Sequence, residues 1–430
     1  MSRIGSYLKN NTVLVIIYSL LFAVFVSWTN PDVLPSMALR ILFLAGMFVP
    51  YIISNKTNKA IFICAFCFFK TVSDYGYSMS YMPASYPLCA LVCIVFFIIC
   101  KPEKVESPLL SNVIFVTFIY VSIVNIVTAF EIPNIVYAFI ITMIAAKYLS
   151  AKGSRGILEW AFILSSLVLS AYMIIFKDMI TMSYGVSDLE RSGWNDPNYF
   201  GCVVAFGALA GVIKIMRGPT DILEKTIIVI AICMSLSAIF LCGSRGAILA
   251  FALPVIFLIF LTKIRIGYRI LLIGVLAVLL YYFWHNSYMD LLIYRIQADD
   301  GTGSNRTEIW AEKLNAYFGN PIGVLFGNGY MGGRTINSGT TQVGFHNDFV
   351  AALVDYGAVG FIIIMTCLFS PFIKLRYKFS QGKYAIASIL LIATVMLTLE
   401  PISDGLLSFY FFYLYSLCLA NESKLILKND

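Results

Sequence analysis

The residues best suited to chemistry are one histidine and two arginines that lie far apart along the chain. His346, one of only 2 histidines, opens the stretch HNDFVAALVDYGAVG, whereas Arg245 lies in LCGSRGAILAF and Arg306 in SNRTEIWAEK. An imidazole has a reference pKa of about 6.5, so it can accept a proton near neutral pH. Guanidinium groups bind phosphate oxygens through paired hydrogen bonds. These residue types therefore predict a substrate that carries phosphate and a histidine that can accept a proton.

The sequence after the histidine predicts a helix that begins at His346 and runs past two glycines. On one straight helix His346, Val350, Leu353, Gly357 and Gly360 share a face, because they recur at alternating intervals of four and three residues. We expect Gly357 and Gly360 to let a neighbouring span approach closely, which would fix the helix that carries the imidazole. The alternative is that His346 is only a helix cap.

Two further polar residues follow the histidine. Asn347 is adjacent to it, and we expect Asn347 to contact the substrate. Asp355 would lie about 13 Å further along the helix at a rise of about 1.5 Å per residue. A charged carboxylate at such depth in a membrane is costly, so we expect Asp355 to pair with a buried polar group or to stay neutral.

Arg245 falls in a tight turn between two apolar runs. Gly243, Ser244 and Gly246 are its neighbours, and the glycines allow the backbone to approach a ligand closely. A charge in a membrane-spanning helix costs roughly 2.5 to 3.5 kcal/mol at the centre and less near the interface. Phosphate binding would offset this cost. The alternative is a side chain that merely extends into water from a short turn.

Arg306 lies at the predicted start of a helix in a long polar segment. Asn305 is placed as its N-cap and Glu308 as its capping-box partner, and Gly319 is expected to end it. Arg306 and Trp310 are one turn apart and share a face. We expect Trp310 to contact the substrate; the alternative is an amphipathic helix that rests on the bilayer with Trp310 as its anchor. The glycines of the following GVLFGNGYMGG predict a loop packed tightly against a ligand or a span.

Three other polar residues are candidate substrate contacts. Asp196 and Pro197 form an N-cap and first helical residue, so a helix N-terminus that attracts anions is expected there. Arg191 and Asn198 flank this start and are expected to face the substrate. Arg334, in the long polar segment, is expected to do the same.

The composition places these residues in a membrane protein. Of the 430 residues 60% are hydrophobic and only 12% are charged, and the mean hydropathy is +0.85. A water-soluble domain would need more charge. Apolar runs long enough to cross about 30 Å of hydrocarbon recur along the whole chain. We therefore expect an all-α polytopic bundle of about 12–14 spans, forming a single domain over 1–430. The runs are 11–29, 37–54, 59–73, 84–100, 110–130, 132–150, 157–176, 197–216, 224–242, 245–262, 267–284, 347–370, 383–400 and 402–420.

The basic residues predict the orientation. Most of the Lys and Arg fall in short connections on one side, together with both termini, and the positive-inside bias makes that side cytoplasmic. The segments 177–198 and 285–345 then face outward. The net charge of +7 follows from these topology signals, so we expect no nucleic-acid partner.

No metal or cofactor is expected. The 10 cysteines lie in apolar runs, Cys64 and Cys67 included, where a thiol usually serves as a small apolar residue. Asp299 and Asp300 lack supporting ligands nearby and are interpreted as a solvated turn. In the absence of an acidic cluster, guanidinium groups are the available positive charges for a phosphate-bearing substrate.

Taken in order, the motifs of residues 190–370 resemble those of the O-antigen ligase and O-antigen polymerase superfamily, which are bacterial membrane glycosyltransferases. They are Asp-Pro-Asn at 196–198, Gly-Ser-Arg-Gly at 243–246, Arg-x-x-x-Trp at 306–310, and His-Asn at 346–347 with Gly-x-x-Gly at 357–360.

The resemblance implies a multi-pass protein of the bacterial inner membrane with its active site facing the periplasm. The donor would be a glycan on undecaprenyl diphosphate, moved to an acceptor hydroxyl with inversion at the anomeric carbon. Arg245 and Arg306 would hold the diphosphate and His346 would take the proton. The resemblance also implies two kinds of partner, membrane lipids and a regulator of polysaccharide chain length.

Two questions stay open at this point. In polymerases the acceptor is another lipid-linked repeat unit, and in ligases it is lipid A-core. The chain is rich in Ile, Phe, Tyr and Lys, as in many strain-variable polysaccharide clusters, and this favours a polymerase on composition alone. A flippase or another transporter is the rival class, but transporters place charges near the midplane and use repeats with broken helices.

Overall fold

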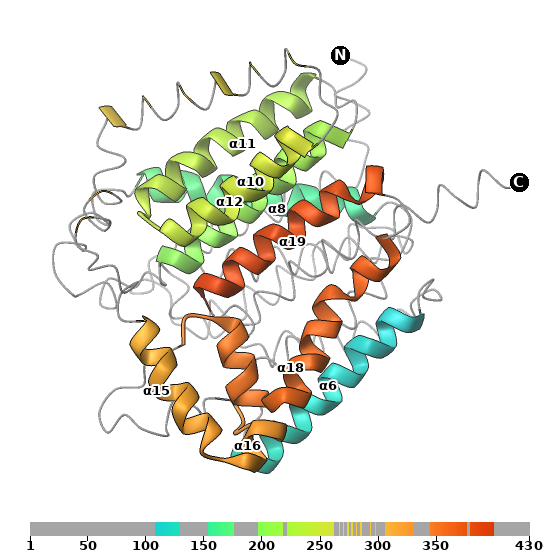
Figure 1. Cartoon of the computed structure of the whole chain (residues 1–430). Coiled ribbons are helices and arrows are strands. Elements are labelled where there is room, and N and C mark those ends of the chain that lie inside the picture. The colour runs from blue at the N-terminus through green and yellow to red at the C-terminus, as the bar shows by residue number, and fades with distance from the viewer. Residues whose placement is uncertain are drawn as a thin grey trace, which may run out of the picture. The chain divides into compact units, whose positions relative to one another are not determined.

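The computed structural model describes residues 108–129, 154–175, 197–217, 222–261, 306–330, 345–375 and 379–399, together with single helical residues between 266 and 297. Within these ranges all regular elements are helices (Figure 1). They form two compact units. The first unit contains α8 (Ser154–Ile175), α10 (Pro197–Arg217), α11 (Ile222–Leu241) and α12 (Arg245–Leu261). The second contains α6 (Pro108–Ala129), α15 (Arg306–Phe318), α16 (Pro321–Phe326), α18 (Asp348–Leu375) and α19 (Phe379–Thr398).

The predicted helical membrane architecture is confirmed for these ranges. Three of the described helices are long and apolar enough to cross a membrane: Asn198–Arg217, Ile222–Leu241 and Asp348–Ser370. Shorter apolar helices cover Phe115–Thr128, Phe162–Ile175, Arg245–Phe260 and Gly382–Thr398. Each coincides with a predicted span. The expected spans 11–29, 37–54, 59–73, 84–100, 132–150 and 402–420 lie outside the described residues, and 267–284 is described only at single residues.

Helix α10 is the centre of the first unit and packs against α8, α11 and α12. Its glycines make this possible because each faces a different neighbour. A Cβ on Gly201 would collide with Ala247 of α12, and one on Gly207 would collide with Ser166 of α8. A Cβ on Gly211 would press against α11. Small residues thus bring three helices close to one, which is how packing stabilises helices in lipid.

The C-terminal end of α10 carries two cations that contact side chains of α8. Arg217 forms an ion pair with Glu159, whose side chain is 4% exposed. One turn earlier, Lys214 lies over the ring of Trp160, with Nζ 5.2 Å from the centroid. A buried carboxylate requires such a partner, since desolvation otherwise penalises its charge.

In the second unit, α18 is broken at Gly357. This residue has φ 69° and ψ 179°, a backbone conformation that only glycine adopts readily. Figure 1 shows the segment before the break and the segment after it running in different directions, the latter beside α6. The expectation that one straight helix face carries His346, Val350, Leu353, Gly357 and Gly360 is therefore wrong, because the residue periodicity is interrupted at Gly357.

The expected close approach at both glycines is nevertheless present, with a different partner at each. A Cβ on Gly357 would collide with backbone atoms of Leu325 and Gly327, at the end of α16. A Cβ on Gly360 would collide with the Tyr120 ring of α6. The missing Cβ of Gly357 thus leaves room for the backbone that follows α16, and that of Gly360 leaves room for α6.

The break leaves helical carbonyl groups that other parts of the unit satisfy. The carbonyls of residues 354–356 accept hydrogen bonds from Asn328 N (3.2 Å), Gly329 N (2.8 Å) and the Tyr120 hydroxyl (2.9 Å), in that order. Backbone groups must be paired in a membrane protein, so these bonds allow the break to persist. Asp355 lies just before the break and is buried, at 5% exposed, as its position suggested.

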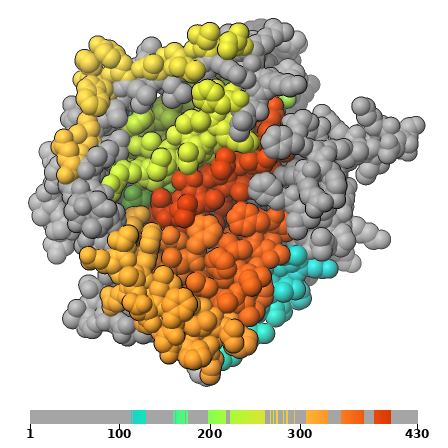
Figure 2. Space-filling model, viewed as in Figure 1, coloured from blue at the N-terminus to red at the C-terminus, as the bar shows by residue number. Residues whose placement is uncertain are grey.

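The stretch GVLFGNGYMGG at 323–333 was expected to form a loop packed tightly against a span or a ligand. Residues 323–326 belong to α16 instead, and the loop 327–330 packs against α18 and α6. Gly327 and Gly329 have φ of 89° and 82°. Tyr330 N donates to Asn125 Oδ1 of α6 at 2.7 Å. Helix α16, which precedes the loop, was not predicted as a helix; Asn320 caps it by accepting from Gly323 N at 3.2 Å. In the space-filling view α15 and α16 cover one side of α18 (Figure 2).

Candidate functional site

The start of α18 is capped by Asn347. Its Oδ1 accepts hydrogen bonds from Phe349 N at 2.9 Å and Val350 N at 3.2 Å. An asparagine side chain at this position satisfies N–H groups that the first helical turn leaves unpaired. The helix therefore begins at Asp348 and not at His346, and Asn347 rather than His346 is its cap. The alternative interpretation of His346 as a helix cap is wrong.

His346 itself has an uncommon backbone conformation. Its φ is 50°, and among the described residues it is the only one other than glycine with positive φ. Such a conformation costs about 1–3 kcal/mol and persists only where the surroundings fix it. His346 is half-buried, and its two neighbours in sequence, Phe345 and Asn347, are buried.

Helix α15 fixes the residue before the histidine. The indole Nε1 of Trp310 donates to the Phe345 carbonyl at 2.7 Å. Nζ of Lys313 lies over the Phe345 ring, 4.5 Å from its centroid. Trp310 was expected to contact the substrate or to anchor a surface helix, and both stay predictions. Its N–H is directed at the backbone beside His346.

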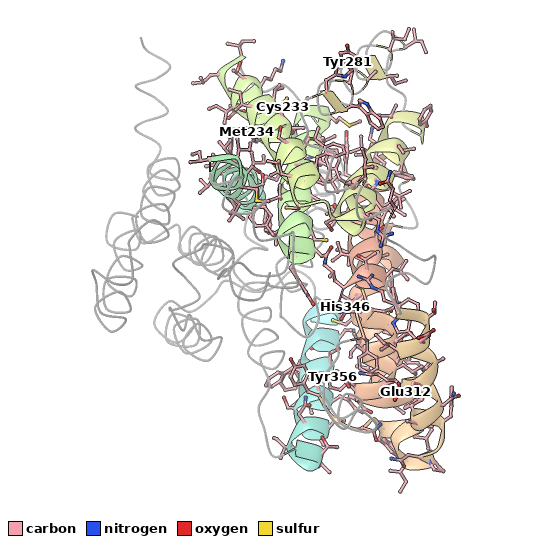
Figure 3. All side chains as sticks on the ribbon, turned by 90° about the vertical axis from the view of Figure 1, so that its left-hand side faces the viewer. Cys233, Met234, Tyr281, Glu312, His346 and Tyr356 are labelled. Carbon is pink, nitrogen blue, oxygen red and sulfur yellow. The ribbon has the colours of Figure 1, made fainter. Side chains whose placement is uncertain are left out.

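An apolar cluster connects α15 to the first segment of α18. It contains the buried residues Tyr317, Phe345, Ala351 and Val354. Tyr317 also donates from its hydroxyl to the Val324 carbonyl at 2.5 Å, and burial raises the pKa of that hydroxyl. In Figure 3, His346 and Tyr356 mark this segment of α18, and Glu312 marks α15.

Arg306 lies at the start of α15, close to the end of α19. Its Nη1 donates to the Thr398 carbonyl at 3.2 Å. Cations are favourable at a helix C-terminus, where carbonyl groups point outward. Arg306 shares a face of α15 with Trp310, as predicted.

Lys313 is a cation beside Phe345 that was not among the predicted site residues. It lies on the Arg306–Trp310 face, seven residues after Arg306. That helical spacing was the available signal. Gly319 follows α15 directly, as predicted, whereas the expected N-cap Asn305 lies outside the described residues.

In the first unit, Arg245 is the first residue of α12, and the predicted tight turn precedes it. Gly243 has φ 58°. Ser244 is buried and caps the helix, because its Oγ accepts from Ala247 N at 3.3 Å. The Arg245 side chain is half-buried. Arg245 thus lies at the N-terminus of α12, where the helix dipole favours an anion.

The starts of α10 and α12 lie side by side. Gly201, one turn into α10, is close enough to α12 that a Cβ would meet Ala247 and approach Ser244. Asn198, the second residue of α10, is half-buried like Arg245. Two adjacent helix N-termini and an arginine form a local environment that favours negative charge.

The predicted site residues fall into both units. Asn198 and Arg245 belong to the first, and the second contains Arg306, Trp310, His346, Asn347, Gly357 and Gly360. The meeting of Arg245 with Arg306 and His346 in one cavity stays a prediction. Arg191 and Arg334 lie outside the described residues. Among those described, no group of three His, Cys, Asp or Glu side chains is arranged to hold a metal ion.

In a comparison with known protein families, residues 229–365 match the family described as O-antigen ligase. The match includes Arg245, Arg306, Trp310 and His346, and it begins after Asn198. The comparison with curated proteins gives no match. This match and the helical membrane architecture support a relationship of residues 229–365 to the superfamily of O-antigen ligases and O-antigen polymerases.

Proposed function

We propose that the protein is a surface-polysaccharide (O-antigen) polymerase that joins repeat units carried on undecaprenyl diphosphate. The O-antigen ligase family match supports a glycosyl transfer on a lipid-linked glycan in the membrane. The observation that carries the proposal is the conformation of His346. Asn347 takes the capping role, while a hydrogen bond from α15 and the cap of α18 hold His346 in a left-handed conformation. Strain of this kind is found preferentially at functional sites.

His346 is the general base in this reaction. The acceptor hydroxyl attacks the anomeric carbon of the donor sugar, and its proton passes to the imidazole. The new glycosidic C–O bond forms as the C–O bond to the diphosphate breaks, and undecaprenyl diphosphate leaves with the bonding electrons. Attack opposite the leaving group inverts the anomeric carbon.

Arg245 and Arg306 stabilise the departing diphosphate. A leaving group with two to three negative charges needs positive charge that is already oriented in the transition state. Arg306 lies in the first turn of α15, and Arg245 lies in the first turn of α12 beside the start of α10. In both places the helix dipole adds to the guanidinium charge. These arginines replace a metal ion in the proposed mechanism.

The length of α18 supports a site at the outer membrane boundary. The segment after Gly357 up to Leu375 extends about 27 Å at about 1.5 Å per residue, which is close to the thickness of the hydrocarbon core. It can cross the membrane without the segment before Gly357. His346 and the first segment of α18 would then lie at the outer face of the bacterial inner membrane, where lipid-linked repeat units are exposed, with both termini in the cytoplasm.

A ligase that transfers the glycan to lipid A-core is the alternative. The family description names a ligase, whereas the composition of the chain favours a polymerase. Surface glycans from a strain that lacks the gene, separated on a gel, distinguish the two. A polymerase predicts lipid A-core with one repeat unit. Bare core with glycan accumulated on the lipid carrier would instead identify a ligase.

Replacement of the proposed base tests the mechanism. In a membrane assay with the lipid-linked repeat unit isolated from the deletion strain, His346→Ala should slow glycan transfer roughly 10²- to 10⁴-fold. Binding of that repeat unit to the purified variant serves as the control for folding. Full-rate transfer by His346→Ala would remove the imidazole from the mechanism.

A further inference from the structure

We propose that Trp310 is a positioning residue: its indole N–H holds the Phe345–His346 peptide and thereby orients the imidazole. This inference rests on the proposed function, because it assumes that His346 takes the proton. It assigns Trp310 a role different from substrate binding.

The backbone around His346 is held on both sides. On one side, the Trp310 indole N–H donates to the Phe345 carbonyl, which belongs to the same peptide plane as the His346 N–H. On the other side, Asn347 is tied to α18 through its side chain, and its carbonyl accepts from Ala351 N at 2.9 Å. The φ and ψ angles of His346 are backbone rotations that lie between these two anchors.

Both anchors are required to keep φ at 50°. A residue with a Cβ prefers the right-handed or extended regions, and a left-handed one persists only where its surroundings over-determine it. Without the indole N–H, the Phe345–His346 peptide can rotate while the cap of α18 remains. The imidazole would then move relative to the rest of α15 and α18.

Helix α15 is suited to this role because it also carries Arg306. Trp310 lies one turn after Arg306 on the same face, and Tyr317 secures the same helix against Phe345 and Val354. The distance between the guanidinium and the imidazole therefore depends on how α15 holds the residue before His346.

The test compares Trp310→Phe with a matched Trp160→Phe control in the full-length protein. The first replacement keeps an aromatic ring and removes the N–H. The second makes the same chemical change in α8, where the indole ring lies beneath Lys214. The assay measures transfer of the lipid-linked repeat unit isolated from the deletion strain, with kcat and KM determined separately.

We expect Trp310→Phe to lower kcat about 10- to 100-fold, since misplacement of a reacting group by about 1 Å has an effect of this size. The KM for the lipid-linked donor should stay unchanged, and Trp160→Phe should retain wild-type kcat. An unchanged kcat in Trp310→Phe would overturn the proposal. So would a raised KM with normal kcat, because that result would make Trp310 a substrate contact.

A double-mutant cycle with Asn347→Ala keeps the proposal testable if folding is affected. Removing either anchor releases the same backbone rotation, so the two losses in kcat should be less than multiplicative when combined. Independent effects would multiply. A cycle in which they multiply would show that the two anchors do not act on one conformation, and the proposal would fail.

The pH profile separates this inference from the proposed function. If His346 is the base, the acidic limb of kcat/KM should persist in Trp310→Phe with a lower plateau and disappear in His346→Ala. A fully active His346→Ala would refute the proposed mechanism. A slow His346→Ala beside a fully active Trp310→Phe would refute only the positioning role.

Discussion

The break in α18 should make Gly357→Ala one of the most destabilising single substitutions in the second unit. With φ 69° and ψ 179°, the position lies in a region almost restricted to glycine, and an alanine there costs about 1–3 kcal/mol. The new Cβ would also collide with backbone atoms of Leu325 and Gly327, which cannot rotate away as a side chain can.

Relief of that collision requires the loop after α16 to move. Two hydrogen bonds would then be lost, from Asn328 N to the Val354 carbonyl and from Gly329 N to the Asp355 carbonyl, at about 1 kcal/mol each. With about 2 kcal/mol for the backbone strain, the expected loss is about 4 kcal/mol.

Gly274→Ala is the matched control for this prediction. Gly274 is helical, and a Cβ there would meet nothing within 4 Å. Its replacement should be neutral or stabilising by up to about 1 kcal/mol, because alanine favours a helix over glycine. Thermal unfolding of the detergent-solubilised variants, followed by tryptophan fluorescence, measures both. If the two variants unfold at the same temperature, α18 tolerates a straight helix at this position and the reasoning is wrong.

Three further predictions concern charge. Arg245→Lys and Arg306→Lys should each restore little glycan transfer compared with the corresponding alanine variant, because one ammonium cannot reproduce the guanidinium fork; equal activity of the Lys variant and wild type would indicate charges that only extend into water. Arg217→Met should lower stability by roughly 3 kcal/mol by leaving the carboxylate of Glu159 buried without its ion-pair partner. Glu159→Gln should cost less, since the 19% exposed Arg217 side chain can reach water, and a reversed order in thermal unfolding would contradict this. Transfer should survive EDTA in the membrane assay, whereas strict dependence on an added divalent cation would count against the arginine mechanism.

The local features of the site could be predicted from sequence because they depend on neighbouring residues. Apolar runs bounded by polar residues predicted α10, α11 and α12 nearly to their ends. In lipid the backbone N–H and C=O groups must be paired within the segment, and a helix pairs them. The turn before Arg245 and the shared face of Arg306 and Trp310 follow from glycine chemistry and helical periodicity.

The break at Gly357 could not be predicted, because it depends on a partner distant in sequence. A glycine in an apolar run is compatible with a helix, a kink or a close helix contact, and the sequence pattern was interpreted as the last of these. The backbone of the loop after α16 occupies the space that a Cβ would need, and its N–H groups satisfy the carbonyls that the break leaves open.

The sequence alone determined the residue types of the proposed reaction, which are an imidazole and two guanidinium groups. It also determined that the protein lies in a membrane. Only the tertiary structure decided how the backbone at His346 is held. Asn347 caps α18, and Trp310 from a separate helix donates a hydrogen bond to the Phe345 carbonyl. The physical reason is that a left-handed φ at a histidine is unfavourable locally, so contacts between distant segments must impose it.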